Sequence, residues 1–594
     1  MMFNLKQARS VLIAVSVWGA AGHPRAQDQA ASIEYRVEIK GVENRRLRKE
    51  LEQVSVSKSL VKRPPRSELQ LRRRAQRDVP VFERMLRNQG FYDVAVTHTL
   101  KKGGKRSVLR FDIDPGEPYL LRKVRLISSD SGVEMPAGEL LGLESGEVAV
   151  AETILQANGI LIRHLRGRGH AFADIVSREV KVVHPDRSVD VTFEVHPGPV
   201  FRFGETTISG LESVDASFIR RKIPWEQGEI FDVREMERVR RRLSSADLFG
   251  TIRVRSAEEA EADVLPVRIE LTERPHRSMF FGVGYGNDQG WRARAGWEHR
   301  NILNRGERLS LESGVSEVGQ ENELSFRRPD VRRVDQNLTL SIKQSVEETR
   351  AFDTNNVGTL ARVDRSVRGH RIVSAGVGMR YAAVETFEDE QAFNLLYLPL
   401  SLSQDRSDDP LDPRRGTRLS LRLAPYWDTL HTETFFVKSG ITLSAYHPVS
   451  ERYQLDWAGR ISLATALGAS RSRIPADERY YAGGGGSVRG YRFQTVGPLE
   501  DGTPTGGRSQ FLIGQELRWR WTDTFGVVGF VDGGVVTEEA VFDSAVDDIR
   551  WGAGLGIRYY TPVGPLRLDM AVPLDRRSGI DEPWQFYISL GQAF

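Results

Sequence analysis

The chain has 594 residues, with 84 Lys or Arg against 80 Asp or Glu, so its formal net charge is only +4. A charge this small argues against a nucleic-acid binder. The chain contains no cysteine, which excludes disulfides, thiolate metal sites and cysteine nucleophiles.

The first residues have the pattern of a secretory signal peptide. Lys6 and Arg9 precede an apolar run at residues 11–21, and small residues follow it. We expect a signal peptide within residues 1–26, cleaved after Ala21 or Ala26. No other apolar run approaches the roughly 20 residues of a membrane-spanning helix. The sequence therefore predicts an exported protein: soluble in the periplasm, secreted, or an outer-membrane β-barrel.

The N-terminal half repeats one pattern. PGEPYLLRKVRL at 115–126 returns as PGPVFRFGETTI at 197–208, and RNQGFYDVAVT at 87–97 returns as RGRGHAFADIVS at 166–177 and, more faintly, as SSADLFGTIRVR at 244–255. Apolar residues at helical spacing precede each of these last segments, and paired strands follow.

A period of about 80 residues with the order strand–helix–helix–strand–strand predicts three copies of a small α+β module. The modules would cover residues 27–114, 115–197 and 198–275. Gly90 and Gly169, at the ends of predicted helices, are C-cap signals.

From residue 276 to 594 the helical spacing gives way to strict alternation. Leu338, Leu340 and Ile342 share one side of a predicted strand. Such alternation suits a soluble sandwich or a membrane barrel whose apolar face meets lipid. The region is too long for one sandwich, and about 20 residues per strand with its share of loop gives about 16 strands. We therefore predict an all-β transmembrane barrel of about 16 antiparallel strands at 276–594. Its last strand would place these residues on one face: Trp584, Phe586, Ile588, Leu590 and Phe594.

Catalytic signatures are missing from the sequence. It has no phosphate loop of the G-x-x-x-x-G-K-[ST] type, no G-x-S-x-G elbow and no H-E-x-x-H helix, and its 11 histidines are scattered. Four acids in SQDRSDDPLDPRRG at 403–416 could bind Ca²⁺ or cap a barrel turn beside neighbouring arginines. We expect a protein that is not an enzyme and has neither a cofactor nor a metal.

The segment AGGGGSVRGYRFQTVGP at 482–498 predicts a loop that folds into the barrel. Its glycines let the backbone turn and approach other chain segments closely, and Arg489 offers a planar fork of donors. A guanidinium inside a barrel needs a carboxylate. The best candidate is Asp532, which shares strand parity with Phe530 and Gly534, so that Phe530 stacks on Arg489 while Asp532 accepts its hydrogen bonds.

These motifs resemble those of the outer-membrane insertase superfamily. Val488, Arg489, Gly490 and Tyr491 resemble its lumenal-loop motif V-R-G-F/Y, and FVDGG at 530–534 resembles its F-x-D-x-G strand motif. YYTPVGPLRLDMAVPL at 559–574 is similar to its penultimate strands, and Phe594 to its barrel-recognition signal. The repeated modules are similar to POTRA domains. Three modules with a 16-strand barrel look most like the TamA type, the autotransporter assembly factors.

The resemblance implies a location in the outer membrane of a Gram-negative bacterium, with the modules in the periplasm. It implies unfolded outer-membrane proteins as clients, outer-membrane lipid as surroundings, and a TamB-like inner-membrane partner that spans the periplasm. A BamA-like general insertase and a two-partner secretion transporter are the alternatives; the first would suggest five modules and the second two.

Insertion of a barrel into lipid is downhill, so the obstacle is the desolvation of unpaired strand edges. We expect a lateral seam between the first strand at 279–286 and the last at 585–594, where glycines weaken packing. The seam residues are Gly282, Gly284, Gly286, Gly591 and Phe594. The Arg489 loop would brace the opposite wall while this seam opens.

Overall fold

The computed structural model describes residues 32–102, 106–130, 132–286, 290–367, 370–387, 389–541, 548–561, 564–590 and 592–594. The predicted signal peptide and Gly591 lie outside these ranges. The chain divides into two compact units: residues 1–126, 137–158 and 178–193 form one, and residues 127–136, 159–177 and 194–594 form the other. The division runs through the second module, and none of the described helices is long and apolar enough to cross a membrane.

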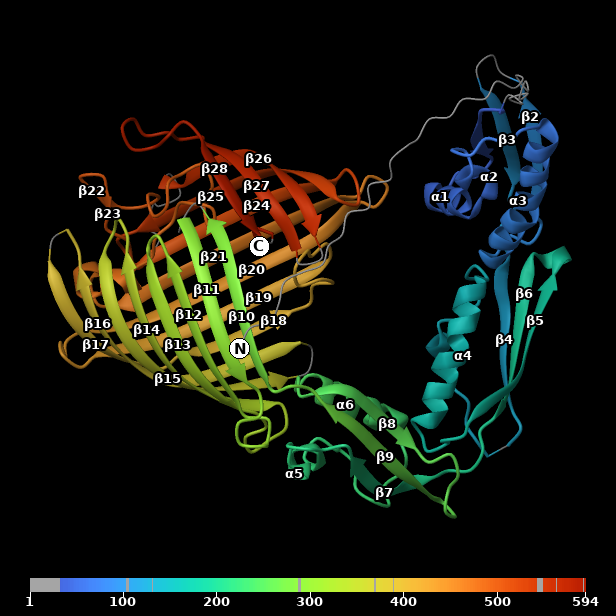
Figure 1. Cartoon of the computed structure of the whole chain (residues 1–594), viewed down its shortest axis with the longest axis horizontal. Helices are drawn as coiled ribbons and strands as arrows, with labels where there is room; N and C mark the ends of the chain where they lie inside the picture. The colour runs from blue at the N-terminus through green and yellow to red at the C-terminus, as the bar shows by residue number, and fades with distance from the viewer. Residues whose placement is uncertain are drawn as a thin grey trace, which may run out of the picture. The chain divides into compact units, whose positions relative to one another are not determined.

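The first module is a three-stranded sheet covered by helices (Figure 1). Its elements are β1 (Tyr35–Lys40), α1 (Arg45–Val54), α2 (Val56–Ser59), α3 (Glu68–Asn88), β2 (Ala95–Lys101) and β3 (Ser107–Asp114). The sheet order is β1-β3-β2, with β1 parallel and β2 antiparallel to β3. Helix α3 begins after Ser67, whose hydroxyl accepts from the Gln70 N–H, and its residues Leu71, Phe82 and Leu86 are fully buried at helical spacing.

The next two modules repeat this order. The second contains β4 (Leu120–Ser128), η1 (Gly138–Leu141), α4 (Ala151–Arg166), β5 (Asp174–Val183), η2 (His184–Asp186) and β6 (Ser188–His196); the third contains β7 (Arg202–Ser209), α5 (Ala216–Arg220), α6 (Val233–Ser244), β8 (Phe249–Ser256) and β9 (Val264–Glu273). Their sheet orders, β4-β6-β5 and β7-β9-β8, match that of the first module. Each predicted boundary falls at or just after the last strand of a module; the boundaries themselves stay predictions.

In all three modules, a residue two or three positions after the long helix has a left-handed backbone conformation. Gly90, Gly169 and Asp247 have φ of +91°, +102° and +60°. A Cβ at Gly90 would lie 2.7 Å from the Val148 side chain, and one at Gly169 would lie 2.7 Å from Val200. Glycine is therefore required at the first two joints, whereas the third tolerates an aspartate, a residue type that adopts the left-handed region more readily than most.

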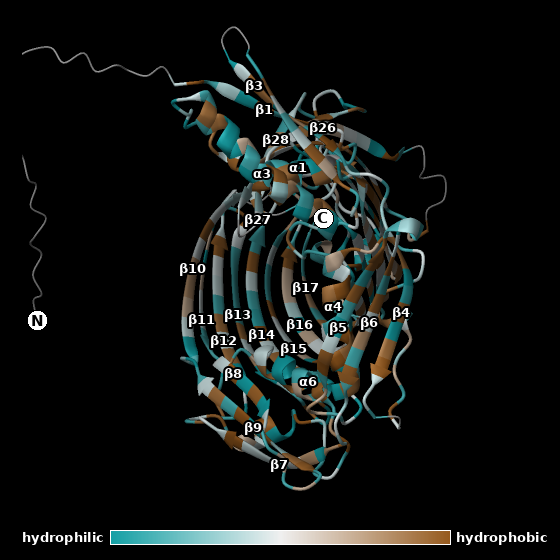
Figure 2. Cartoon of the chain, turned by 90° about the vertical axis from the view of Figure 1, so that its right-hand side faces the viewer, coloured by the Kyte–Doolittle hydropathy of each residue, from teal (hydrophilic) through white to brown (hydrophobic). Residues whose placement is uncertain are grey.

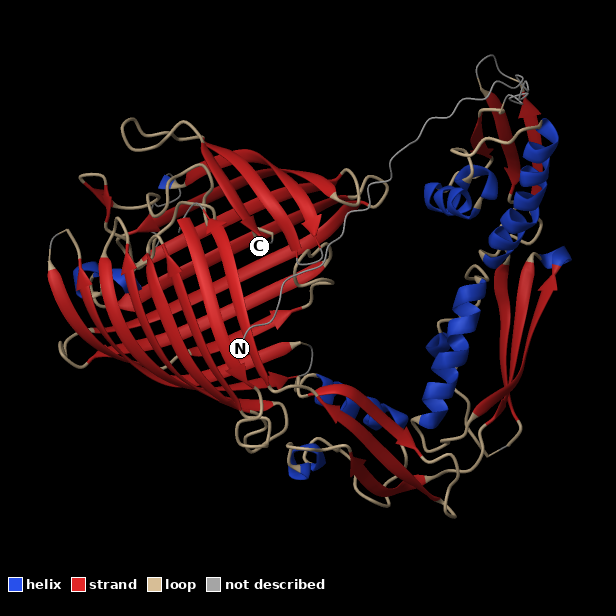
Figure 3. Ribbon diagram, viewed as in Figure 1, coloured by secondary structure: helices blue, strands red, loops and turns tan. Residues whose placement is uncertain are grey.

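The rest of the chain is one antiparallel sheet (Figures 1 and 3). Its strands are β10 (Arg277–Gly286), β11 (Gly290–His299), β12 (Arg308–Ser316), β13 (Gly319–Arg328), β14 (Gln336–Glu348), β15 (Asp353–Val367), β16 (Arg371–Glu385), β17 (Glu390–Tyr397), β18 (Leu400–Asp405), β19 (Gly416–Asp428), β20 (Phe435–Ser450), β21 (Leu455–Gly468), β24 (Ser509–Arg520), β25 (Phe525–Thr537), β26 (Arg550–Thr561), β27 (Gly564–Pro573) and β28 (Gln585–Leu590). Strands β17 and β18 both pair with β16 and with β19, so they form one crossing interrupted at Pro399. The 17 strands of the sheet therefore make 16 crossings, and the predicted fold class is confirmed.

Alternation along these strands separates two faces. Apolar residues of the outer face are exposed, such as Leu340 at 43% and Ile342 at 52%, while charged side chains such as Arg558 and Asp569 are fully buried inside. Figure 2 shows apolar and polar residues alternating along the barrel strands. An apolar outer face over a polar interior is the pattern of a barrel that sits in lipid.

Candidate functional site

The loop between β21 and β24 carries the glycine run, and it folds back on itself as a tight turn. It contains η3 (Arg471–Arg473), η4 (Ala476–Glu478) and the short strands β22 (Leu499–Glu500) and β23 (Thr503–Pro504). Gly483 and Gly484 have φ of +105° and +96°. The Ser487 hydroxyl donates to the Gly483 carbonyl at 3.0 Å and accepts from its N–H at 2.9 Å, and the Gly484 N–H donates to the Tyr491 carbonyl at 3.1 Å. The glycines therefore build a hydrogen-bonded turn that presents Val488–Tyr491.

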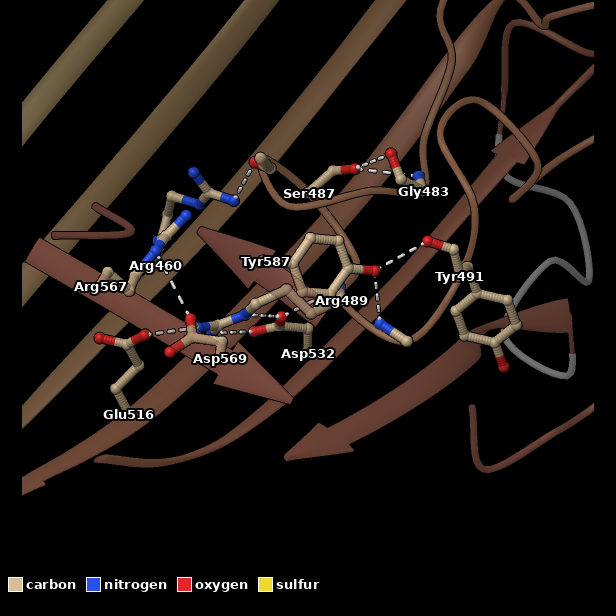
Figure 4. A network of polar contacts seen from close by, with 12 residues as sticks. Arg460, Gly483, Ser487, Arg489, Tyr491, Glu516, Asp532, Arg567, Asp569 and Tyr587 are labelled. Carbon is tan, nitrogen blue, oxygen red and sulfur yellow. Dashed lines mark hydrogen bonds and ion pairs between the residues drawn. The ribbon is translucent and has the colours of Figure 1, made fainter. Parts of the chain in front are cut away.

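Arg489 lies at the tip of this turn and is 2% exposed. It donates to both carboxylate oxygens of Asp532, from Nε at 2.6 Å and Nη2 at 2.9 Å, and its backbone N–H adds a third bond at 3.2 Å. Nη1 donates to Glu516 at 2.8 Å and to Asp569 at 3.0 Å (Figure 4). The guanidinium carbon lies 3.5 Å from the centroid of the Phe530 ring. One cation thus ties the loop to β24, β25 and β27.

The backbone around the tip is equally constrained. Gly490 has φ +104°, and a Cβ there would lie 2.8 Å from the Val572 carbonyl. Its N–H donates to the Tyr587 hydroxyl at 3.0 Å, which in turn donates to the Tyr491 carbonyl at 2.9 Å. The Tyr491 hydroxyl donates to the Trp551 carbonyl at 3.1 Å. The loop tip is therefore also hydrogen-bonded to β26 and β28.

Glycines in the strands make room for the tip. A Cβ at Gly534 would lie 2.6 Å from Val488, and a Cβ at Gly552 would overlap the Arg489 carbonyl oxygen. Strand parity places Gly534 on the same face as Phe530 and Asp532, and its missing side chain leaves room for the loop.

The charges around Arg489 continue into a wider cluster. Glu516 accepts from Arg518 Nε at 2.8 Å, and Asp569 pairs with Arg558 and, at 3.5 Å, with Arg567. All five side chains are at most 8% exposed. Because the interior screens charge poorly, each of these groups depends on its partners far more than a surface ion pair does.

A second anchor holds the early part of the loop to a different part of the sheet. Asp477 and Glu478 in η4 pair with Arg380 of β16 at 3.1 and 3.0 Å. Lys438 of β20 donates to the Glu478 carboxylate at 2.7 Å and lies 5.0 Å from the Tyr480 ring centroid. The loop therefore bridges two separate parts of the barrel interior.

The sheet order begins at β10 and ends at β28. These two strands lie next to each other, yet no hydrogen-bonded ladder joins their described residues. On β10, Gly282, Gly284 and Gly286 alternate with the outward residues Phe281, 82% exposed, and Val283, 86% exposed. The predicted seam glycines thus lie on the strand at one end of the sheet.

The predicted position of Phe594, on the outer face of the last strand, is wrong. Strand β28 ends at Leu590, and the Phe594 ring lies inside the barrel beside Gly514 and the guanidinium groups of Arg460 and Arg518. Strand parity fails here because residues 592–594 are not part of the strand. Gly591 lies outside the described residues.

Sequence reasoning missed three partners of the loop: Glu516, Asp569 and Tyr587. Glu516 and Asp569 carried a usable signal, since each is an acid at an inward position of an alternating strand. Within the described part of the chain, no group of three or more His, Asp or Glu side chains is arranged to hold a metal ion.

A barrel of 16 crossings with an inward loop, preceded by three small α+β modules, defines a class of outer-membrane β-barrel protein. Residues 301–594 match the family described as the Omp85 superfamily domain, so this part of the chain, which holds most of the barrel, is a domain of that superfamily. Its barrel lies in the outer membrane and its modules are periplasmic POTRA domains.

Several bacterial proteins are similar to this chain. The outer membrane protein assembly factor BamA of Nitratidesulfovibrio vulgaris is 23% identical over 541 residues, which cover 87% of this chain and 68% of that protein. BamA of Neisseria meningitidis is 21% identical over 593 residues, which cover 85% and 71%. The crystal structure of Haemophilus ducreyi BamA lacking POTRA domains 1–3 has a TM-score of 0.62 at 19% identity and covers 79% of this chain and 99% of that one. Because the sequence identity is so low, this structural similarity supports the fold and nothing further.

Proposed function

We propose that this protein assembles other β-barrel proteins into the outer membrane through the seam between β10 and β28. The observation that carries the proposal is that no ladder joins the described residues of these adjacent strands. An edge in lipid has unpaired N–H and C=O groups, which favour temporary pairing with a strand from a client. The assembly role of the BamA relatives supports the same function.

The finer assignment is a TamA-like factor that serves autotransporters, with a TamB-like partner spanning the periplasm. Three modules support it, since each sheet has its own exposed edge for strand addition. A BamA-like general insertase is the alternative, and the sequence likeness to BamA favours it. Deletion of the gene should reduce autotransporters at the surface while leaving porins unchanged; equal loss of both would favour the general insertase.

The protein would act without a catalytic reaction of its own. Its contribution would be kinetic, because a paired edge removes the desolvation barrier to insertion. Clients would reach it unfolded from the periplasm.

A cysteine lock tests the seam. Cysteines introduced along β10 and β28 are joined by oxidation, and the assembly of an autotransporter is followed in vesicles; the chain has no cysteine of its own. We expect the locked protein to lose assembly activity and to regain it on reduction. The matched control joins Ser345 and Asn356, partners in the β14–β15 ladder, and should change nothing. Full activity of the locked seam would disprove the proposal.

A further inference from the structure

Residues 592–594, which follow β28, lie inside the barrel rather than along its wall. The Phe594 ring centroid lies 5.2 Å from the guanidinium carbon of Arg460 and 5.5 Å from that of Arg518. A Cβ on Gly514 in β24 would lie 3.2 Å from the Phe594 ring, a tight contact, so the ring packs closely over this glycine. Two cations over one aromatic ring form a specific site for that ring.

Gln592 is held from a distant part of the sequence. Its amide donates to Asp412 Oδ1 at 2.8 Å, and Arg558 Nε donates to its carbonyl oxygen at 3.4 Å. Asp412 belongs to the turn between β18 and β19, so this turn reaches the segment after the last strand. Arg518 contacts both, donating to the Pro413 carbonyl at 3.4 Å and to the Phe594 carbonyl at 3.3 Å.

The arginines that hold this segment share a carboxylate with the loop. Glu516 Oε1 accepts from Arg489 at 2.8 Å and lies 3.7 Å from Arg558 Nη2, while Oε2 accepts from Arg518 at 2.8 Å. The side chains of all four residues are at most 4% exposed. A change at Arg489 must therefore redistribute the hydrogen bonds of Arg518 and Arg558.

We propose that residues 592–594 are a latch that holds the end of the last strand inside the barrel, and that Glu516 couples this latch to the Arg489 loop. With Arg489 in place, Glu516 is shared, and Arg518 keeps donors free for Phe594. When Arg489 withdraws, Glu516 and Asp569 draw Arg518 and Arg558 toward themselves, and the latch loosens. If the latch loosens, the seam becomes exposed, and this consequence rests on the proposed function. The coupling between the Arg489 loop and the latch does not rest on it.

A proximity measurement on the full chain in lipid vesicles tests the coupling without any client. Asp412→Cys with Gln592→Cys is bridged by a short bis-thiol reagent, and the bridging rate reports how often the latch is closed; the contacts of Phe594 remain in this reporter. We expect Phe594→Ala to slow bridging about tenfold, which corresponds to about 1.4 kcal/mol. Arg489→Met, which does not touch residues 592–594, should slow it several-fold.

Two variants complete the test. Glu516→Gln keeps the shape of the shared side chain and removes the charge that draws Arg518 away from Phe594, so it should quicken bridging, and this holds even if Arg489→Met folds poorly. Lys438→Met weakens the other loop anchor and should leave bridging unchanged. An unchanged rate in both Arg489→Met and Glu516→Gln, or slower bridging in Glu516→Gln, would overturn the coupling, and an unchanged rate in Phe594→Ala would overturn the latch. Because no client is present, failure of the assembly function would leave these results intact.

Discussion

Strands β24–β27 and strands β10–β11 belong to one sheet and have similar backbone ladders, but they differ in how their side chains are held. The first group is tied to a loop by buried ion pairs, and the second has glycines beside open space. On the inner face of β25, Arg489 contacts three carboxylates and an aromatic ring, and all of these side chains are at most 4% exposed. On the inner face of β10, a Cβ at Gly282 or Gly286 would meet no described atom within 4 Å. The comparison indicates that two parts of one barrel can differ in local stability although their backbone hydrogen bonding is alike. We call β24–β27 the rigid side and β10–β11 the yielding side, because local stability depends on the side-chain contacts that hold each strand.

The largest effect should come from Arg489→Asp, which removes the tether of the rigid side. It leaves Glu516, Asp532 and Asp569 without their shared cation and adds a fourth negative charge. Breaking a buried ion pair from one side costs about 3–5 kcal/mol, so we expect loss of the folded, heat-modifiable form in gel electrophoresis. An unchanged melting temperature would show that the loop does not brace the wall.

A charge swap between Arg489 and Asp532 tests how the tether is shared. Arg489→Asp combined with Asp532→Arg should recover only a small part of the loss, because Glu516 and Asp569 would still face the new carboxylate. Full recovery would mean that Asp532 is the only partner that matters.

Gly490→Ala should have the next largest effect. A Cβ at this position meets the Val572 backbone at 2.8 Å, and φ of +104° is unfavourable for alanine. Strain of this kind costs about 1–3 kcal/mol and should lower the melting temperature. Gly486→Ala is the matched control, because a Cβ at Gly486 would have no described atom within 4 Å. Equal melting temperatures for the two variants would contradict the close approach of the tip.

On the yielding side, Gly282→Val should stabilise β10 slightly, by about 0.5–1 kcal/mol, because glycine is unfavourable within a strand. We expect slower assembly of a client despite equal or higher thermal stability. Gly440→Val in β20, far along the sheet, adds the same bulk at a glycine where a Cβ would make only ordinary contacts at 3.6 Å, and it is the matched control. Faster assembly by Gly282→Val would argue against a seam at β10.

The smallest effect concerns the third module and pH. Burial alone would raise the pKa of the Glu273 carboxyl, but hydrogen bonds from the Ser213 hydroxyl and from the N–H groups of Val214, Glu212 and Ser213 lower it to about 2, below its ordinary 4.5. The stabilisation is therefore fully present above pH 4.5 and is lost as the pH falls toward 2. Hydrogen exchange at 212–214 should be slower than in Glu273→Gln at pH 6, and the difference should shrink between pH 4.5 and 2. A constant difference over that range would contradict the low pKa.

The sequence was sufficient for much of this architecture. Alternation predicted the barrel, and the repeated segments predicted the three modules. Strand parity placed Asp532 and Phe530 on the inner face, where the structure has both in contact with Arg489 of the inward-folding loop. These features depend on local periodicity, which a single sequence contains.

The remaining contacts depend on register between strands and on where a strand stops. Glu516 and Asp569 reach the same guanidinium only because β24 and β27 lie on either side of β25 and β26. Phe594 continues the alternation of the last strand in sequence, yet it lies inside because residues 592–594 are no longer in a strand. Alternation marks Glu516 and Asp569 as inward acids, but no local signal shows which guanidinium they reach or that Phe594 lies inside.

Hydrogen–deuterium exchange of the reconstituted full chain tests the central claim most directly, by comparing β11 with β25. Both strands are paired on both sides, so an edge effect cannot explain a difference between them. We predict that β11 amides exchange at least about tenfold faster than β25 amides, a difference of about 1.4 kcal/mol in opening free energy, and that Arg489→Met removes most of this difference by loosening β25. Equal exchange of the two strands in the unmodified protein would contradict the account.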